Sequence, residues 1–285
     1  MSGQLVAPPE EAQSDITLRM RSGHPQIAEG DACMLARVEA FCRELGRPPR
    51  IFNVGCGSGY LAWQLSRLHP RADVVAHETD ATLLEALKRR VKGTDVRVFS
   101  KPFEEYQEPI DILISWGSHH HLPQSYLTHG RSLLTKGGLF LLGDEFCPEY
   151  CGSADAERIA GAELIRVVKG FVLTSEAELQ AHEKRGEIPE AARTLEKQRQ
   201  QALWRWYRYV IDYAMERDHV DVALYELRAT HDDLITSSSD EQKLSPLIVE
   251  KDLALHGYRQ VARHCMAPQL DKSLQSFFIY ELAAA

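Results

Sequence analysis

Apolar residues along the chain follow two alternating spacings, which predict strands and helices in turn. Short apolar runs at residues 51–54, 73–77, 96–99, 111–115 and 139–143 predict five strands. Between these runs, apolar residues recur every three or four positions, as in amphipathic helices. Because strands that alternate with helices over short connections pair in parallel, we expect a parallel sheet with helices on both faces.

The pattern changes after Pro148. From residue 154 to about residue 227 the spacing is helical without strand-like alternation, which predicts a helical cap inserted into the fold. A helix at 247–255 and strands at 258–264 and 276–282 then return the chain to the sheet. The fold class is therefore α/β, a doubly wound sheet with a cap. The predicted segments are a tail or lid at 1–27, the α/β core at 28–150, the cap insertion at 151–230 and the return to the core at 231–285.

Composition and charge exclude several classes of protein. The 33 Lys and Arg residues against 41 Asp and Glu give a net charge of −8, the wrong sign for a protein whose partner is nucleic acid. No apolar stretch is long enough for a membrane span, and the polar N-terminus does not resemble a signal peptide. We therefore expect a cytoplasmic protein with reduced cysteines. Cys147 and Cys151 form a C-x3-C pair without further ligands at metal spacing, so no metal site is predicted.

The first predicted strand ends at a glycine-rich turn, Gly55-Cys56-Gly57-Ser58-Gly59. Glycines at such a turn let a ligand approach the backbone, while the following helix offers unpaired N–H groups. Glu78 ends the second strand, where a carboxylate can accept hydrogen bonds from the hydroxyls of a ribose. Together they predict a nucleoside site at the carboxyl ends of these strands. A tight structural turn and an acid at a helix start are the alternatives.

Several motifs in order resemble the class I S-adenosylmethionine-dependent methyltransferases. They are the glycine turn within 53–59, the acidic strand end at 76–78, the strand 111–115 with His120-His121-Leu122 after it, and Leu134-Thr-Lys-Gly-Gly138. The resemblance extends over residues 50–146. It implies a sheet of seven strands with the last strand antiparallel, and S-adenosylmethionine as the cofactor. A dinucleotide-binding fold is the rival, but its G-x-G-x-x-G requires glycine where this chain has Tyr60.

The resemblance also implies how the cofactor is bound. The glycine turn would lie under its methionine part, Glu78 would bind the ribose and Phe103 would lie against the adenine. Pro102 stands where the family usually has Asp, so adenine recognition would rely on backbone groups, packing or Glu104. The predicted cofactor-binding residues are Asn53, Gly55, Cys56, Gly57, Gly59, Glu78, Thr79, Pro102, Phe103, Ser115, Trp116 and Gly117.

Polar residues after the fourth and fifth strands are candidates for the chemistry. An imidazole ordinarily titrates near neutral pH, so His120 and His121 are candidates to take a proton, and Glu145 ends the fifth strand at the same crevice. These three are the predicted catalytic residues, with a structural role as the alternative for each histidine. The predicted substrate-binding residues are Trp116, Ser118, His119, Asp144, Trp206 and Tyr207.

Two groups of cap residues have alternative interpretations. The helix that carries Trp206 and Tyr207 either contacts the substrate or packs the cap onto the core. The polar group of His231, Asp232 and Asp233 either closes over the site or caps a helix.

These features predict a methyltransferase that acts on a small-molecule acceptor of secondary metabolism. A cap above the crevice leaves little room for a folded macromolecule and excludes water from the reaction. The alternative is another use of the same cofactor: aminocarboxypropyl transfer, intramolecular cyclisation that releases methylthioadenosine, or a cofactor-assisted cyclase. The sequence is compatible with a monomer or a homodimer.

Overall fold

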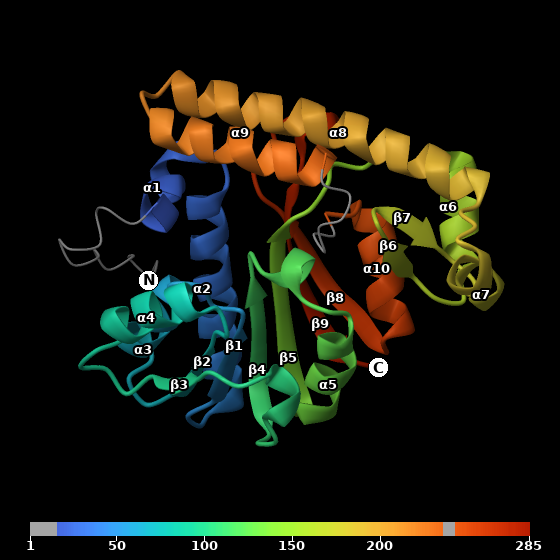
Figure 1. The fold of residues 1–285 in the computed structure, drawn as a ribbon. Coiled ribbons are helices and arrows are strands. Elements are labelled where there is room, and N and C mark those ends of the chain that lie inside the picture. The colour runs from blue at the N-terminus through green and yellow to red at the C-terminus, as the bar shows by residue number, and fades with distance from the viewer. Residues whose placement is uncertain (1–15, 236–242) are drawn as a thin grey trace.

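The computed structural model describes residues 16–235 and 243–285, and its centre is a sheet of seven strands (Figure 1). The strand order is β3-β2-β1-β4-β5-β9-β8. β9 runs antiparallel to both of its neighbours, and the other six strands share one direction. The predicted doubly wound, mostly parallel sheet is therefore confirmed. The strands are β1 (Arg50–Val54), β2 (Asp73–His77), β3 (Arg97–Phe99), β4 (Ile110–Trp116), β5 (Leu134–Glu145), β8 (Tyr258–Cys265) and β9 (Phe277–Ala284).

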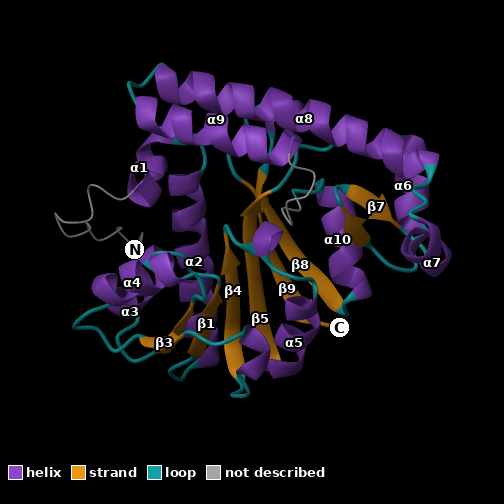
Figure 2. Ribbon diagram, in the orientation of Figure 1, coloured by secondary structure: helices purple, strands orange, loops and turns teal. Residues whose placement is uncertain are grey.

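Helices cover both faces of the sheet because successive residues of each strand point to opposite sides (Figure 2). In β1, Ile51 is buried in the core that contains residues of α2 (Ile27–Leu45), α3 (Tyr60–Leu68) and α4 (Ala81–Arg90). The next residue, Phe52, is buried in the second core, with residues of α5 (Ser125–Leu133) and α10 (Pro246–Leu255). The near-continuous apolar runs of the strands follow from this double burial.

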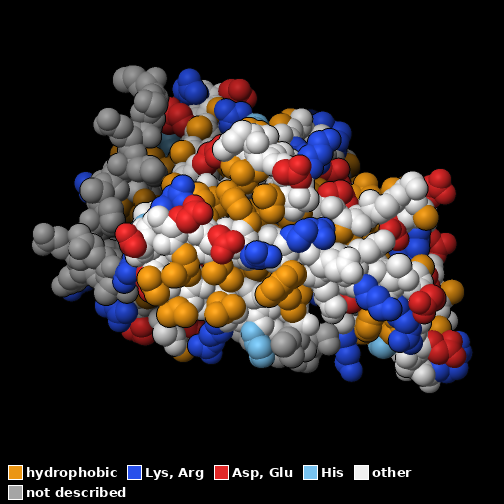
Figure 3. Space-filling model, turned by 90° about the horizontal axis from the view of Figure 1, so that it is seen from above, with side chains coloured by type: hydrophobic (Ala, Val, Ile, Leu, Met, Phe, Trp, Pro, Cys, Tyr) orange, Lys and Arg blue, Asp and Glu red, His pale blue; other side chains and the backbone are white. Residues whose placement is uncertain are grey.

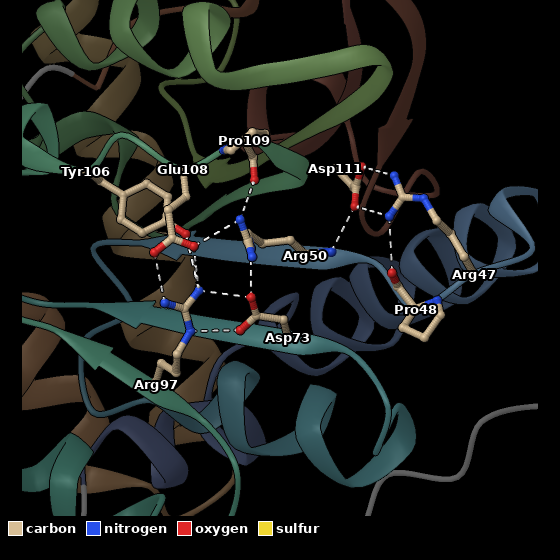
Figure 4. A network of polar contacts seen from close by, with 9 residues as sticks. All are labelled: Arg47, Pro48, Arg50, Asp73, Arg97, Tyr106, Glu108, Pro109 and Asp111. Atoms are coloured by element: carbon tan, nitrogen blue, oxygen red, sulfur yellow. Dashed lines mark hydrogen bonds and ion pairs between the residues drawn. The ribbon is translucent and has the colours of Figure 1, made fainter.

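An ion-pair network ties four neighbouring strands together at their amino ends (Figure 4). Asp73 accepts hydrogen bonds from Arg50 at 2.7 Å and from Arg97 at 2.8 Å. Asp111 accepts a bidentate pair from Arg47 at 2.7 and 2.8 Å, and the backbone N–H of Arg50 at 2.9 Å. The arginines and carboxylates at this end of the sheet pair with one another, whereas ligands of such sheets bind at the opposite, carboxyl ends.

The cap consists mainly of two long helices that lie across the carboxyl ends of the strands (Figure 1). These are α8 (Glu190–Met215) and α9 (Val220–Ile235), preceded by α6 (Ser153–Ala160) and α7 (Glu176–Arg185). The short α1 (Ile16–Gly23) packs against α9 and α2. Because α9 continues to Ile235, the boundary predicted between residues 230 and 231 falls inside a helix.

The prediction of a purely helical insertion is wrong at one place. The cap contains a two-stranded hairpin, β6 (Arg166–Val168) and β7 (Phe171–Leu173). Its turn residues, Lys169 and Gly170, have φ of 50° and 83°, as in a two-residue hairpin turn. Strands of three residues are too short to show the alternation on which strand prediction depends.

Strand β5 is longer than the predicted run 139–143, because it begins at Leu134 and includes Lys136-Gly137-Gly138. Its pairing with β4 shifts between Ile110, which lies opposite Leu134, and Ile112, which lies opposite Leu139. The additional residues of β5 therefore form a bulge within the strand.

The outer face of the cap carries apolar side chains (Figure 3). On α9, Val220, Leu224 and Leu227 are about half exposed, and their spacing places them on one helix face. The opposite face, which contains Glu226, is buried. No helix in residues 16–235 and 243–285 is long and apolar enough to cross a membrane.

Candidate cofactor and active site

A cavity of about 280 Å³ lies between the carboxyl ends of β1, β4 and β5 and the cap helix α9. Residues from α1 and from the glycine turn also line it. The structure therefore brings distant parts of the chain to one place. The predicted site residues that line this cavity are Asn53, Gly55, Cys56, Gly57, Trp116, Gly117, His120, His121, Asp144 and Glu145.

The glycine turn needs glycine for both conformation and space. Gly55 and Gly57 have φ of 59° and 56°, which other residues rarely adopt. A Cβ atom on Gly55 would lie 2.8 Å from Cβ of Ser118, whereas one on Gly57 would project into open space. Ser118 Oγ lies 2.9 Å from Oγ of Ser115 and donates to the carbonyl of Val54. These two serines therefore support the turn from below, and the side of Gly57 is open to a ligand.

Glu78 joins the glycine turn to the end of β2. Its carboxylate accepts the backbone N–H groups of Gly57 at 2.9 Å, Thr79 at 2.8 Å and Asp80 at 2.9 Å. The side chain is 7% exposed. Because a carboxylate can accept about four hydrogen bonds, about one position remains for a further donor.

Asn53 contributes an acceptor without a partner. Its side chain is 1% exposed, it lines the cavity, and Oδ1 has no hydrogen-bond partner among residues 16–235 and 243–285. Since buried polar atoms are normally paired, this oxygen is suited to a donor from a bound ligand.

Trp116 forms part of the cavity wall and is fixed by charged residues. Its ring packs so closely that a Cβ atom on Gly30 or Gly143 would lie within 3 Å of it. Its Nε1–H donates to Asp31 at 2.8 Å, and Asp31 also accepts from Arg21 at 2.6 Å. These contacts therefore hold the indole in a single orientation at the cavity wall.

His120 and Asp144 form a hydrogen-bonded pair in the wall of the cavity. Nδ1 of His120 lies 2.8 Å from Oδ1 of Asp144, and the His120 backbone N–H donates to Oδ2 at 3.0 Å. Burial alone would raise the pKa of Asp144, but the charge and hydrogen bond of His120 outweigh it and lower the pKa to about 2. Asp144 is therefore ionised at neutral pH. Its carboxylate accepts the Nδ1–H of His120.

The three consecutive histidines have different surroundings. His119 points into the core, where Nδ1 lies 2.6 Å from the hydroxyl of Tyr126. It does not line the cavity, although it was predicted to bind the substrate. His121 stacks beside His120 with ring centroids 3.8 Å apart. Desolvation and the neighbouring His120 lower the pKa of His121 to about 4, which keeps it neutral at pH 7.

Other predicted residues do not line this cavity. Phe103 is 4% exposed and packs against Phe52 and His129, with ring centroids 4.9 Å apart in each pair. Trp206 and Tyr207 are fully buried between the cap and the sheet, and Nε1 of Trp206 donates to Glu145 at 2.7 Å. The predicted residues without a place among the lining residues are Gly59, Glu78, Thr79, Pro102, Phe103, Ser115, Ser118, His119, Trp206 and Tyr207.

A buried charged cluster joins the cap to β5. Its central residue, Lys243, was not among the predicted site residues. The ammonium group of Lys243 lies 3.3 Å from Glu145 and 3.3 Å from Asp233, and it donates to the hydroxyl of Tyr207. Tyr207 in turn donates to Asp233. Asp233 thus belongs to the cap–core contact rather than to a helix cap. His231 is exposed, and the side chain of Asp232 lies outside the described residues.

Two other residues that the sequence analysis missed carry a recognisable signal. Asp31 and Glu226 occupy the apolar faces of α2 and α9, three or four residues from buried Leu35 and Val222. An acidic residue within an apolar helix face indicates a buried carboxyl group. Lys243 has no such signal.

His24 gives the folded protein a predictable sensitivity to acid. Burial lowers its pKa to about 4, whereas in the unfolded chain it takes up a proton near pH 6.5. The free energy of unfolding should therefore fall by about 3 kcal/mol as the pH decreases from 6.5 to 4. Thermal unfolding of the wild type and of His24→Asn across this range measures the contribution. A pH dependence that is identical in the two proteins would contradict it.

The structure describes only residues 16–27 of the predicted lid. Met20, Arg21 and Ile27 line the cavity, and Arg19 pairs with Asp221 of α9 at 2.7 Å. Residues 1–15, where the rest of the predicted lid lies, are outside the described residues. The lid stays a prediction.

Comparison with known proteins gives a match to residues 51–138 with a family described as a methyltransferase domain. The chain is 24% identical over 125 residues to ribosomal RNA small subunit methyltransferase C of Alcanivorax borkumensis, covering 41% of this chain and 36% of that protein. It is 34% identical over 68 residues to malonyl-[acyl-carrier protein] O-methyltransferase of Bacillus anthracis, covering 23% and 25%. The matches thus span about a quarter to a third of these relatives.

Among solved structures, the chain is similar to magnesium protoporphyrin IX methyltransferase from Synechocystis PCC 6803 with bound S-adenosylhomocysteine. The two are 12% identical, with a TM-score of 0.47, and the similarity covers 95% of this chain and 88% of that chain.

The site has features that fit S-adenosylmethionine. The unpartnered Oδ1 of Asn53 suits the amino group of its methionine part, and the open side of Gly57 gives that part space. Glu78 lies at the end of β2 with about one acceptor position left for a sugar hydroxyl. The matched segment contains all three residues. Residues 51–138 therefore match a methyltransferase domain, a family that uses S-adenosylmethionine as its cofactor.

Proposed function

We propose that this protein transfers the methyl group of S-adenosylmethionine to a nucleophilic atom of a small molecule. The observation that carries the proposal is one cavity whose wall contains both the glycine turn and the His120–Asp144 pair. When bound, the cofactor supplies a methyl group made electrophilic by its sulfonium sulfur. Positioning of the acceptor at about 3 Å from this methyl group would account for much of the acceleration.

His120 is the proposed base. With its Nδ1–H held by Asp144, its Nε2 takes the proton from an acceptor hydroxyl or amine as the new bond forms. The carboxylate of Asp144 stabilises the imidazolium that results. Asp144 keeps its own position because it also accepts the backbone N–H of Glu145 at 2.8 Å.

The cap and the size of the cavity favour a small molecule as the acceptor. The cavity of about 280 Å³ is close to the lower end of the range of small-ligand pockets, about 300 Å³, and residues of α9 form part of its wall. The net charge of −8 does not favour a nucleic acid as the substrate. A small acceptor is also in keeping with the predicted role in secondary metabolism. This role and the predicted cytoplasmic location stay part of the proposal.

The sulfur-containing product tests this function. The purified protein is incubated with S-adenosylmethionine, alone and with a panel of small phenols, amines and carboxylic acids, and the products are identified by mass. S-adenosylhomocysteine formed only with an acceptor is the expected result. Methylthioadenosine as the product, or conversion of an acceptor with the cofactor unchanged, would contradict methyl transfer and favour another use of the cofactor.

A further inference from the structure

Glu226 is a buried carboxyl group at the wall of the cavity. It lies on the sheet-facing side of α9, is 2% exposed, and lines the cavity. Its Oε1 has no hydrogen-bond partner within residues 16–235 and 243–285. Leaving a buried polar group unpaired is costly, so such an atom in a cavity indicates the place of a ligand group.

The nearby cation cannot serve Glu226. Lys243 has three N–H donors, and these are directed to Glu145, Asp233 and Tyr207. The single positive charge of Lys243 therefore lies between the carboxylates of Glu145 and Asp233. The cluster therefore carries an excess negative charge before Glu226 is counted.

The groups facing Glu226 come from several elements. Glu145 at the end of β5, Asp233 on α9 and Lys243 act on it electrostatically, while His24, which lies 3.9 Å from Glu145, is neutral at pH 7. Burial and the charges of Glu145 and Asp233 raise the pKa of Glu226 to about 8, against the opposing effect of Lys243. Without a ligand, Glu226 is therefore protonated at neutral pH.

We propose that Glu226 recognises the acceptor, and that this acceptor carries a protonated amine which pairs with the Glu226 carboxylate. A cation is attracted by the excess negative charge of the cluster, whereas an anionic acceptor is repelled. In this step the ammonium group binds intact, and the carboxyl group of Glu226 releases its proton to the solvent. The inference rests on the proposed function, because it names the substrate class of the same site.

The cofactor itself also carries positive charge, but the residues that fit it come from another strand. The residues that fit its methionine part, Asn53 and Gly57, belong to the β1 end of the cavity. Glu226 instead interacts with Glu145 and Lys243 above β5, the side on which His120 and Asp144 lie. Its ligand is therefore assigned to the acceptor.

Calorimetry on the full chain with bound S-adenosylhomocysteine tests this inference. The probes are benzylamine and 2-phenylethylamine, each compared with its alcohol, at pH 7 in two buffers of different ionisation enthalpy. The amines should bind at least about 10-fold more tightly than the alcohols, as expected for a charged hydrogen bond in a buried site. Each amine bound should release close to one proton, since Glu226 changes from the acid to the carboxylate.

Two variants assign the proton to its residue. Glu226→Gln should remove the proton release and the preference for amines while S-adenosylhomocysteine still binds. It should fold, because glutamine has the shape of the protonated acid. The matched control is Glu183→Gln at an exposed position of α7, which should behave as the wild type.

The outcomes separate the inference from the proposed function. Equal binding of amines and alcohols, no binding of either amine at millimolar concentration, or proton release that persists in Glu226→Gln would overturn the role of Glu226. Failure of the wild type to bind S-adenosylhomocysteine would instead remove the proposed function, and the inference with it.

Discussion

Replacing His120 by glutamine is expected to lower kcat for methyl transfer by about 10²–10⁴-fold, the range that a positioned general base contributes. Glutamine has no nitrogen that can take a proton from the acceptor. The variant should still fold, because Asp144 continues to accept the backbone N–H groups of residue 120 and Glu145. Steady-state kinetics with the acceptor identified by the product assay measure the effect.

Two comparisons define the role of His120. Affinity for S-adenosylhomocysteine should not change, because His120 lies on the acceptor side of the cavity. His264→Gln provides the control, since this histidine lies on β8 and is hydrogen-bonded to Glu281. A decrease in kcat of less than about 5-fold would show that the acceptor loses its proton without His120, and that positioning alone carries the reaction.

Replacing Glu78 by alanine is expected to weaken binding of S-adenosylhomocysteine by about 10- to 100-fold. The loss corresponds to about 1–3 kcal/mol, the cost of removing a buried charged hydrogen-bond acceptor. Part of this effect comes from the protein itself, because the N–H groups of Gly57, Thr79 and Asp80 lose their acceptor. Calorimetric titration of the variant and the wild type gives the ratio of affinities.

Two further variants separate the causes of this loss. Glu85→Ala, at an exposed position of α4, should bind as the wild type does. Glu78→Gln keeps one acceptor oxygen and should lie between the wild type and the alanine variant. Unchanged affinity in Glu78→Ala would remove Glu78 from the cofactor site.

The sheet and the glycine turn could be predicted because their signals are local. The strands of the core are apolar runs bounded by turns, and the turn at Gly55–Gly59 follows its strand directly. The hairpin β6–β7 escaped prediction because three residues on each side of Lys169 and Gly170 form no periodic pattern. Local pattern thus determined the order of elements, but not short pairings within the cap.

Most differences between the predicted and the observed site come from the direction in which side chains point. The sequence placed Phe103 after β3, but whether its ring faces a ligand or the core depends on Phe52 and His129 across the fold. His119 and His120 are adjacent, yet the short 3-10 turn at His119–His121 directs one to the core and the other to Asp144. Such directions follow from contacts between distant segments, which periodicity does not report.

The charged cluster shows the same limit. Glu145 was predicted from its place at a strand end, but its partner Lys243 is 98 residues away and follows no recognisable motif. Trp206 was predicted from the spacing of aromatic residues on one helix, and its role became clear only from its hydrogen bond to Glu145. The cap residues therefore had to be assigned from the three-dimensional structure.

The most direct test of the account is a calorimetric titration of the full chain with S-adenosylhomocysteine at neutral pH. The account rests on a nucleoside cofactor that contacts both the glycine turn and Glu78. It predicts binding of one S-adenosylhomocysteine per chain, with the affinity reduced in Glu78→Ala. A folded protein that gives no binding heat with S-adenosylhomocysteine, or that binds it equally well without Glu78, would contradict it.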